Sequence, residues 1–428
     1  WSATPAARRA ELLNAAADLL AERAEEIAGT MTAECGATFG WGMFNCTLAA
    51  GMLRHAASLA GDVDAEQAIE SAVPGLNARA IRQPVGVVVG IAPWNAPVIL
   101  ATRAVATPLA FGNTVVLKAS EECPRTHAAV ARAIDDAGVP AGVINLITNQ
   151  PSDAADVVEA LIAHPAVKRI NFTGSTKVGR IIASKAAEHL KRTLLELGGK
   201  APFVVLADAD LDEAAAAANF GAFMNSGQIC MSTERIVVDQ SVADALGEKL
   251  VARTSALTVG DPRDPGTMIG PVVNAAAAQR VRELIDDAVA QGATILTGGD
   301  ADGLVITPTV VSGVTPAMRI YAEESFGPVV TMIAVDGPDE AVRVANDTEY
   351  GLSAAVFGAD ADNAQAVARR IQSGICHVNG ATVHDEPQMP FGGVKASGWG
   401  RFGGDAALDE FTELRWLTVQ DGSRHYPI

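Results

Sequence analysis

The pattern of hydrophobic positions along the chain predicts strands and helices in alternation. Apolar runs such as VGVVVGIAP, TVVLKAS and KRINFTGS are each followed by a stretch with helical spacing, as far as about residue 197. A second alternation begins at Ala201 with PFVVLAD and continues through ERIVVD, FGPVVTMIAV and SAAVFGA. Strands that alternate with helices at this spacing are typical of parallel sheets with helices on both faces. We therefore predict an α/β protein with two doubly wound, Rossmann-like lobes.

The two ends of the chain depart from this alternation. The first sixty residues predict two or three amphipathic helices, residues 62–82 predict a β-hairpin, and the tail LRWLTVQ predicts a strand that pairs with it. We therefore expect three units. They are a first lobe of residues 1–61 and 83–197, a second lobe of residues 198–400, and a small β oligomerisation element of residues 62–82 and 405–428.

The charge balance and the cysteines narrow the class of protein. The 428 residues include 32 Lys and Arg against 50 Asp and Glu, and the net charge of −18 disfavours nucleic acid or an anionic membrane as a partner. The longest apolar run, 85–93, is too short to cross a bilayer. Five scattered cysteines without a C-x-x-C pair argue for a reducing compartment and against disulfides or a metal site. We expect a cytoplasmic protein whose natural N-terminus precedes Trp1, since the chain has no initial Met.

One stretch, FGAFMNSGQICMSTER at 220–235, is the strongest candidate for chemistry. An Asn-Ser-Gly turn interrupts an Ala-rich helix here, so Cys230 is predicted to lie in a loop. A thiol becomes nucleophilic in a partly open, polar setting, whereas a lone cysteine is more often a buried structural residue. Glu196 in LLELGGK and Asn95 in APWNAP favour the first interpretation. A thiol, a carboxylate and an amide donor are the groups needed for covalent catalysis at a carbonyl, followed by attack of water.

The usual G-x-G-x-x-G motif of a dinucleotide site is absent. The junction TGSTKVG, residues 173–179, joins a strand to a helix whose N-terminus could hold a pyrophosphate, although a plain loop fits the pattern equally well. Lys118 and Glu121 follow a strand at the edge where ligands gather in α/β sheets, or else form a solvated surface pair. A carboxylate at that edge can accept hydrogen bonds from both ribose hydroxyls and would repel a 2′-phosphate.

Seven motifs together resemble the aldehyde dehydrogenase superfamily, in its order and spacing. They are APWNAP, VLKASE, FTGSTKVG, LELGGK, GQIC, EESFGP and PFGGVKASGWGR. The tail GICHVNGATVHDEPQMPFGGVKASGWGRFGG is more specific and resembles the bacterial aromatic-aldehyde branch, which contains salicylaldehyde, vanillin and benzaldehyde dehydrogenases. Against typical members the front of the chain is short by a few dozen residues.

The resemblance implies a role for each candidate residue. Cys230 is the expected nucleophile and Glu196 the general base, while Asn95 donates its amide to the oxyanion together with the Cys230 backbone N–H. Thiolate attack gives a thiohemiacetal, hydride passes to the nicotinamide, and the thioester is hydrolysed by water that Glu196 deprotonates.

The resemblance also implies that the first lobe is the NAD-binding domain and the second lobe the catalytic domain. NAD is expected as the cofactor, with NADP less favoured. Its expected contacts are Lys118 and Glu121 at the adenosine ribose, Ser175 and Gly174 at the pyrophosphate, Glu324 at the nicotinamide ribose, Phe326 near the ring, and Trp94.

The substrate pocket is predicted from three residues. Ala96 leaves width for a flat ring where many aliphatic-aldehyde relatives carry a bulky aromatic residue. Arg103 lies about two helical turns after Asn95, and in an apolar tunnel it needs a substrate oxygen or a nearby acid as a partner. Met224 stands where the succinate-semialdehyde branch keeps a second arginine.

Three alternatives stay open at this point. A succinate-semialdehyde dehydrogenase would use Arg103 for the carboxylate of its substrate. Relatives that pass the thioester to coenzyme A typically lack the base that Glu196 supplies. A non-catalytic binding protein on the same scaffold would be expected to have lost Cys230 or Glu196. We predict NAD-dependent oxidation of an aromatic aldehyde by a homodimer or homotetramer, with no nucleic acid, membrane or metal involved.

Overall fold

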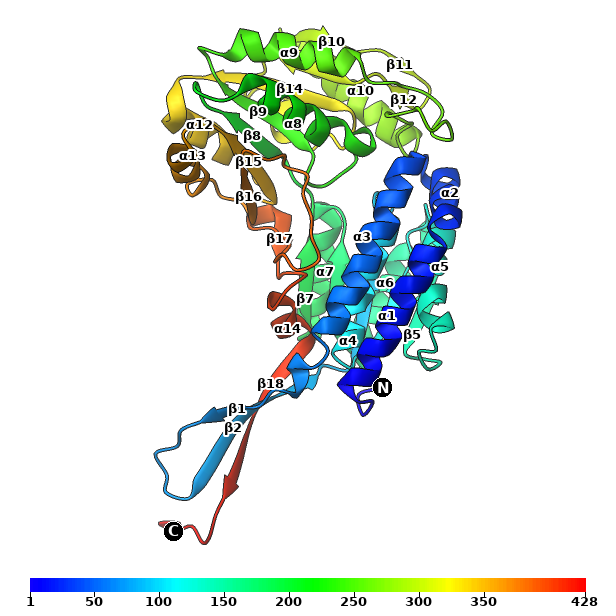
Figure 1. Cartoon of the computed structure of the whole chain (residues 1–428), viewed down its shortest axis with the longest axis vertical. Coiled ribbons are helices and arrows are strands. Elements are labelled where there is room, and N and C mark those ends of the chain that lie inside the picture. The colour runs from blue at the N-terminus through cyan, green and yellow to red at the C-terminus, as the bar shows by residue number, and fades with distance from the viewer.

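The computed structural model describes residues 1–428 and consists of two α/β lobes and a projecting β-arm (Figure 1). One lobe is built on a six-stranded sheet, the other on a seven-stranded sheet, and the arm on a three-stranded sheet. The predicted α/β fold class with two Rossmann-like sheets and a small β element is thereby confirmed. No helix is long and apolar enough to cross a membrane.

The first sheet has the strand order β17-β7-β6-β3-β4-β5. Its strands are β3 Val87–Ile91, β4 Thr114–Lys118, β5 Ile144–Ile147, β6 Val167–Thr173, β7 Arg192–Glu196 and β17 Gly398–Trp399. All neighbours are parallel except β17 and β7. Because β17 lies within residues 198–400, the chain returns to the first sheet near its end, and the domain boundaries stay a prediction.

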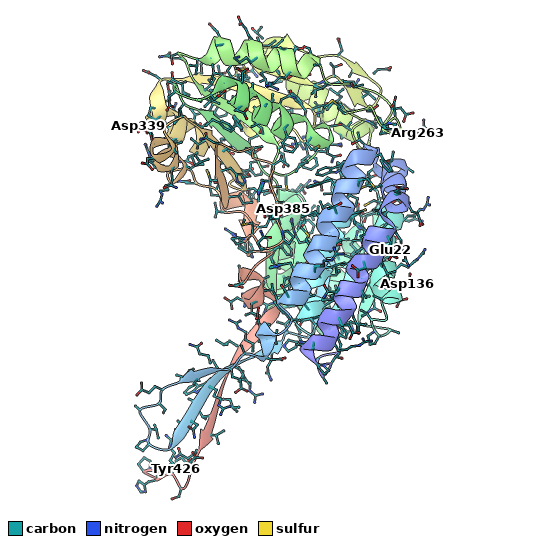
Figure 2. All side chains as sticks on the ribbon, in the orientation of Figure 1. Glu22, Asp136, Arg263, Asp339, Asp385 and Tyr426 are labelled. Atoms are coloured by element: carbon teal, nitrogen blue, oxygen red, sulfur yellow. The ribbon has the colours of Figure 1, made fainter.

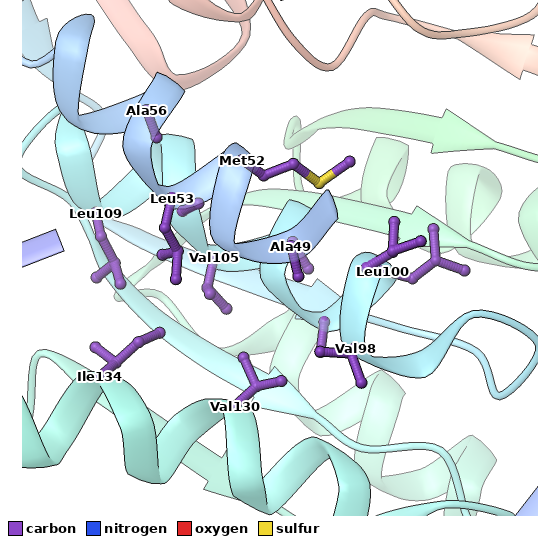
Figure 3. Packing of buried hydrophobic residues seen from close by; sticks show 14 of the residues in the cluster. Ala49, Met52, Leu53, Ala56, Val98, Leu100, Val105, Leu109, Val130 and Ile134 are labelled. Atoms are coloured by element: carbon purple, nitrogen blue, oxygen red, sulfur yellow. The ribbon is translucent and has the colours of Figure 1, made fainter. Parts of the chain in front are cut away.

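Helices cover both faces of the first sheet. On one face lie α4 Pro97–Ala110 and α5 Pro124–Asp136, and on the other lie α6 Ala154–Ala163 and α7 Thr176–Glu188. The N-terminal helices α1 Ala6–Glu22, α2 Ala24–Cys35 and α3 Phe39–Ser58 pack outside α4 and α5. Figure 3 shows Leu53 of α3 beside Val105 and Leu109 of α4. This packing buries α4 almost completely and fixes the loop that precedes it.

The second sheet has the strand order β10-β13-β14-β9-β8-β15-β16 and is parallel except at β10. Its strands are β8 Ala201–Val205, β9 Thr233–Asp239, β10 Thr294–Thr297, β13 Thr309–Ser312, β14 Val329–Val335, β15 Ser353–Phe357 and β16 Ile375–Val378. The accompanying elements are α8 Leu211–Phe223, α9 Ala243–Ser255, α10 Ala275–Ala290, α11 Arg319–Ala322, α12 Gly337–Asn346, α13 Ala361–Ala368 and the hairpin of β11 Ala301–Asp302 and β12 Val305–Ile306.

The arm combines the predicted hairpin with the tail. In it β1 Gln67–Ile69, β2 Leu76–Pro84 and β18 Thr412–Gln420 form an antiparallel sheet in that order, with α14 Ala406–Phe411 at its base. The predicted pairing of the tail with residues 62–82 is therefore correct. Figure 1 shows the arm extending away from both lobes, with the C-terminus at its tip. Leu414, Trp416 and Val419 of β18 are 63%, 74% and 55% exposed.

Candidate active site

Asn95, Glu196 and Cys230 come from three separate segments and meet where the lobes join. Glu196 is the last residue of β7, Asn95 lies between β3 and α4, and Cys230 lies in the loop between α8 and β9. Because β3 and β7 both run parallel to β6, their carboxyl ends lie at the same edge of the sheet. The second lobe brings the cysteine loop to that edge, where Asn95 Nδ2 donates to the backbone oxygen of Gln228 at 3.0 Å.

The loop before Cys230 has a constrained backbone. Asn225, Ser226 and Gly227 have φ angles of 50°, 55° and 71° in succession, which places all three in the left-handed region. A Cβ at Gly227 would lie 2.1 Å from the backbone oxygen of Gly327, so only glycine fits there. Asn225 Nδ2 donates to the backbone oxygen of Asn95 at 2.9 Å, which ties the loop to the first lobe. Such strain persists only where surrounding contacts enforce it, and it clusters at functional sites.

Cys230 and Glu196 influence each other electrostatically. Glu196 is fully buried, and neither of its carboxylate oxygens has a hydrogen-bond partner of good geometry. Burial raises the pKa of Glu196 above its usual range, although the positive charge of Arg103 opposes this. Burial and the negative charge of Glu196 raise the pKa of the Cys230 thiol well above its ordinary value. The pair is therefore a protonated thiol next to a carboxylate that binds protons more readily than usual.

Two N–H donors remain available beside Cys230. Its own backbone N–H donates to no protein group. The side-chain amide of Asn95 uses one hydrogen for Gln228, and an amide carries two, so the second is free. Trp41, on α3, donates from Nε1 to the backbone oxygen of Asn95 at 3.0 Å and so helps to hold that residue.

The glycine pair after Glu196 allows close approach of the two lobes. A Cβ at Gly199 would lie 2.3 Å from the backbone oxygen of Cys230, so a larger residue would push the thiol loop away. Gly199 also donates its N–H to Glu324 Oε1 at 2.9 Å. Burial raises the pKa of Glu324 to about 7, with that hydrogen bond acting in the opposite direction. Gly199 therefore adjoins both Cys230 and Glu324.

A buried ion pair that the sequence analysis missed holds the neighbouring loop. Lys200 Nζ donates to Glu234 Oε2 at 2.6 Å, and both side chains are at most 5% exposed. Glu234 Oε1 accepts the backbone N–H groups of Ser325 and Phe326 at 2.8 and 3.2 Å. Phe326, whose φ is 51°, meets Trp94 edge-to-face with the ring centroids 5.7 Å apart. The pair therefore fixes the segment that carries Glu324 and Phe326. Its sequence signal, a Lys and a Glu each beside an apolar strand, did not indicate that the two meet.

A groove of about 520 Å³ lies along the carboxyl ends of the strands of the first sheet. Lys118 and Glu121 are on its wall, and Lys118 Nζ donates to Glu121 Oε1 at 2.5 Å. Asn149 Nδ2 donates to the same oxygen at 2.8 Å. Burial would raise the pKa of Glu121, but the hydrogen bonds from Lys118, its own backbone and Asn149, together with the charge of Lys118, outweigh this and hold the pKa below its usual value. Because the Lys118 side chain is only 5% exposed, the alternative of a solvated surface pair is wrong.

Gly174 and Trp94 also line the groove, together with Val178 of α7. Ser175 is the N-cap of α7, where its side-chain oxygen accepts the N–H of Val178 at 3.4 Å. The N-terminus of α7 therefore adjoins the groove, and backbone N–H groups at a helix start are suited to an anion. The volume, the helix terminus and the carboxylate at the strand ends fit a dinucleotide.

Arg103 does not stand alone beside α4. Its Nη2 forms an ion pair with Asp385 Oδ2, and the two side chains are 6% and 10% exposed. Asp385 belongs to the segment between β16 and β17, and Figure 2 shows it in the narrow middle of the molecule, between the lobes. The acid that the sequence analysis required for this arginine is thus present. Ala96 and Met224, together with Cys230, pack in the same apolar cluster as Phe391, whose ring lies 4.1 Å from the Arg103 guanidinium carbon.

Comparison with known proteins gives a consistent result. A family model described as "Aldehyde dehydrogenase family" matches residues 1–417. Vanillin dehydrogenase of Pseudomonas fluorescens is 56% identical over 431 residues, which cover 100% of this chain and 88% of that protein. The chain therefore belongs to the aldehyde dehydrogenase family. It is an oxidoreductase that oxidises aldehydes.

Two solved structures extend the comparison. The crystal structure of a salicylaldehyde dehydrogenase from Pseudomonas putida G7, complexed with salicylaldehyde, has a TM-score of 0.98 at 45% identity and covers 100% of this chain and 88% of that one. Succinate-semialdehyde dehydrogenase from Burkholderia pseudomallei has a TM-score of 0.95 at 34% identity and covers 98% of this chain and 87% of that one. The predicted resemblance to the aldehyde dehydrogenases, and within them to vanillin and salicylaldehyde dehydrogenases, is confirmed.

Proposed function

We propose that this protein oxidises an aromatic aldehyde to its carboxylic acid with NAD, using Cys230 as nucleophile and Glu196 as general base. The observation that carries the proposal is the fully buried carboxylate of Glu196, which has no charged partner in hydrogen-bond contact and whose side-chain hydrogen-bonding neighbours are the Cys230 thiol and Thr173. A buried carboxylate without a charged partner is costly unless it has work to do on a substrate or on water. The aromatic substrate is supported by relatives named as vanillin, salicylaldehyde and benzaldehyde dehydrogenases.

Each residue of the site has a defined part in this reaction. The thiolate form of Cys230 adds to the carbonyl carbon, and the developing oxyanion receives hydrogen bonds from the Cys230 N–H and the free amide hydrogen of Asn95. A nicotinamide cofactor held in the groove by Lys118 and Glu121 would supply the acceptor for the hydride that leaves that carbon. Glu196 then takes a proton from water, whose oxygen displaces Cys230 from the thioester and releases the acid. Removing one oxyanion donor commonly costs about 10²–10³-fold in rate, so the loss of Asn95 should affect kcat more than KM.

The cofactor residues are assigned on the same basis. The family uses NAD or NADP, and the groove of the first lobe supplies the contacts. Glu121 accepts hydrogen bonds at one oxygen only, which leaves the other for a ribose hydroxyl and favours NAD over NADP. Lys118 would hold Glu121, Ser175 and Gly174 would adjoin the pyrophosphate, and Glu324, Phe326 and Trp94 would surround the nicotinamide end.

The arm is assigned to assembly. Its exposed apolar residues on β18 and its open strand edge are suited to a second copy of the chain, so we propose a homodimer or homotetramer in which residues 62–82 and 405–428 take part. The lobes of residues 1–61 with 83–197 and of residues 198–400 would act as the NAD-binding and catalytic domains.

The test is a substrate panel. Steady-state kcat/KM is measured for benzaldehyde, salicylaldehyde, vanillin and succinic semialdehyde, each with NAD and with NADP. We expect the three aromatic aldehydes with NAD to give the highest values. Succinic semialdehyde as the best substrate would favour the second candidate function, in which Arg103 binds a carboxylate, but the pairing of Arg103 with Asp385 argues against it.

A further inference from the structure

The Arg103–Asp385 ion pair occupies the space beside the middle of α4. Arg103 lies between two aromatic rings, with its guanidinium carbon 4.1 Å from the ring centre of Phe391 and 5.8 Å from that of Phe402. The cavity that Arg103 and Asp385 both line has a volume of only about 20 Å³. A single water needs about 10–15 Å³ of such space, so this small cavity has no room for a carboxylate that would compete with Asp385 while the pair is formed.

We propose that Asp385 is a specificity-determining residue: by neutralising Arg103 it reserves this part of the substrate path for uncharged aldehydes and excludes aldehydes that carry a carboxylate. The inference rests on the proposed function, and it concerns a pair that lies near the reacting thiol, because the charge of Arg103 acts on both Glu196 and Cys230. It goes further because it assigns the choice of substrate class to an acid on the segment between β16 and β17.

The argument begins with what an arginine does alone. A free guanidinium between aromatic rings is a good site for a carboxylate, because its fork of N–H groups can donate two parallel hydrogen bonds. Here one nitrogen of the fork, Nη2, already donates to Asp385 Oδ2, and the charge of Asp385 neutralises that of the guanidinium. A substrate carboxylate would have to displace Asp385 and leave it unpaired in a buried place, or remain unpaired itself. Either outcome places an uncompensated negative charge in a region where the side chains are at most 10% exposed.

No other cation lines the cavity to compensate for that charge. Its remaining titratable residues are His55 of α3 and Glu386. Burial lowers the pKa of His55, so its ring is neutral at pH 7. Glu386 adds a second negative charge and pairs with His384 at 2.9 Å. Toward Cys230 the next charged group is Glu196, a further carboxylate. An anionic substrate therefore meets carboxylates in excess of cations, whereas benzaldehyde carries no charge and is not repelled.

The test is the substrate ratio of the variant Asp385→Asn. The ratio is kcat/KM for 4-carboxybenzaldehyde divided by kcat/KM for benzaldehyde, with succinic semialdehyde as a second anionic aldehyde. Asparagine keeps the shape of the side chain but frees the charge of Arg103, so we expect the ratio to rise at least tenfold. Asp385→Ser should give the same rise, so the test does not depend on one variant folding.

Three controls separate this effect from others. Asp385→Glu keeps the charge and should leave the ratio within about twofold of the wild type. Asp339→Asn changes the net charge equally on a side chain that Figure 2 shows at the far edge of the second lobe, so it should not change the ratio. Arg103→Met combined with Asp385→Asn removes the cation and should abolish the gain.

An unchanged or lower ratio in both Asp385→Asn and Asp385→Ser would overturn the proposal. The same would follow if the double variant kept the gain, since Arg103 would then not be the group that binds the carboxylate. Failure of the proposed function gives a different result, because the wild-type protein would then fail to oxidise benzaldehyde at all.

Discussion

Two pairs of side chains come from the same two segments of the chain, four residues apart on each. Glu196 and Cys230 form the first pair, and Lys200 and Glu234 form the second. Glu196, Lys200 and Glu234 are all at most 4% exposed, so burial does not distinguish them. Their hydrogen bonds do. Both oxygens of Glu234 have donors, one from Lys200 and others from backbone N–H groups, whereas Glu196 has no donor of good geometry and only the neighbouring Cys230 thiol and Thr173 near its oxygens.

The difference separates a structural site from a reactive one. A buried charge whose hydrogen bonds are complete is held in place, and such a network keeps the surrounding segments rigid. A buried carboxylate without charged partners is poised to take up a proton, which is what the raised pKa of Glu196 expresses. The first pair is therefore available for chemistry, while the second positions the loop of Glu324 and Phe326 beside it.

The largest expected effect is at the nucleophile. Cys230→Ala should abolish aldehyde oxidation, because no other group in the site can form the thioester. Binding of NAD should remain, since the thiol is not part of the cofactor groove. Cofactor reduction followed by absorbance, and NAD binding followed by calorimetry, check the two statements. The matched control is Cys376→Ala, which removes an exposed cysteine of β16 and should retain activity. Turnover at the wild-type rate in Cys230→Ala would disprove the mechanism.

The second effect is at the base. Glu196→Gln should slow the steady state by about 10²–10⁴-fold, because water is no longer deprotonated. The first turnover should persist as a burst of NADH, since removing the negative charge of Glu196 also removes one cause of the raised pKa of Cys230. Rapid mixing measures the burst, and mass spectrometry detects the acylated cysteine. Equal loss of burst and steady state would assign Glu196 to activation of the thiol instead.

The sequence indicated Glu196 and Cys230 as candidates but did not indicate the pairing of Lys200 with Glu234, for a physical reason. Cys230 follows a turn that breaks a helix, and Glu196 ends an apolar strand before two glycines, so each is conspicuous locally. Lys200 and Glu234 meet across 34 positions, and Arg103 and Asp385 across 282. Such pairings depend on how segments fold together and leave no periodic signal. Arg103 could be expected to need an acid, but nothing in the sequence indicated which one.

The same distinction holds for the fold. Strands buried on both faces, such as β3 and β9, were visible as apolar runs. The edge strands β10 and β16 are short and half-exposed, so their residues show no comparable run and the sequence analysis missed them.

The third effect compares the two pairs by stability. Glu234→Leu leaves Lys200 buried without its partner and should lower the free energy of unfolding by about 3–5 kcal/mol. Glu196→Gln should do the opposite and raise it, because the amide avoids burying a charge. Thermal or urea unfolding measures both. Lys200→Met combined with Glu234→Leu should recover much of the loss, and Glu323→Leu, which breaks an exposed pair with Arg319, should cost less than about 1 kcal/mol.

The effect of pH sharpens this prediction. The folded-state pKa of Glu196 is raised, so its contribution to stability is fully present below its unfolded pKa and is lost as pH rises through the folded value. The advantage of Glu196→Gln over the wild type should therefore grow between pH 5 and pH 8. If the difference in free energy of unfolding between Glu196→Gln and the wild type shrank over that range, the fold would stabilise Glu196 as a carboxylate. Glu196 would then resemble Glu234.

The smallest expected effect is at Glu121. Its hydrogen bonding is intermediate between that of Glu234 and that of Glu196. One of its oxygens accepts from Lys118 and Asn149, as in a structural site, and the other accepts from no side chain, as in a reactive one. The open oxygen is suited to a ribose hydroxyl, and a hydrogen bond to a charged group is worth about 1.5–3 kcal/mol. Glu121→Ala should therefore reduce the preference for NAD over NADP, measured as the ratio of kcat/KM values, by about tenfold.

The matched control for Glu121 is the next residue along the chain. Glu122 contacts Asn274 at 3.0 Å and is exposed, so Glu122→Ala removes the same charge without touching the groove. If the NAD to NADP ratio stayed constant in Glu121→Ala, or fell equally in Glu122→Ala, the carboxylate would act through net charge or not at all. A change confined to Glu121→Ala would instead show that half of a carboxylate can be structural while the other half selects the cofactor.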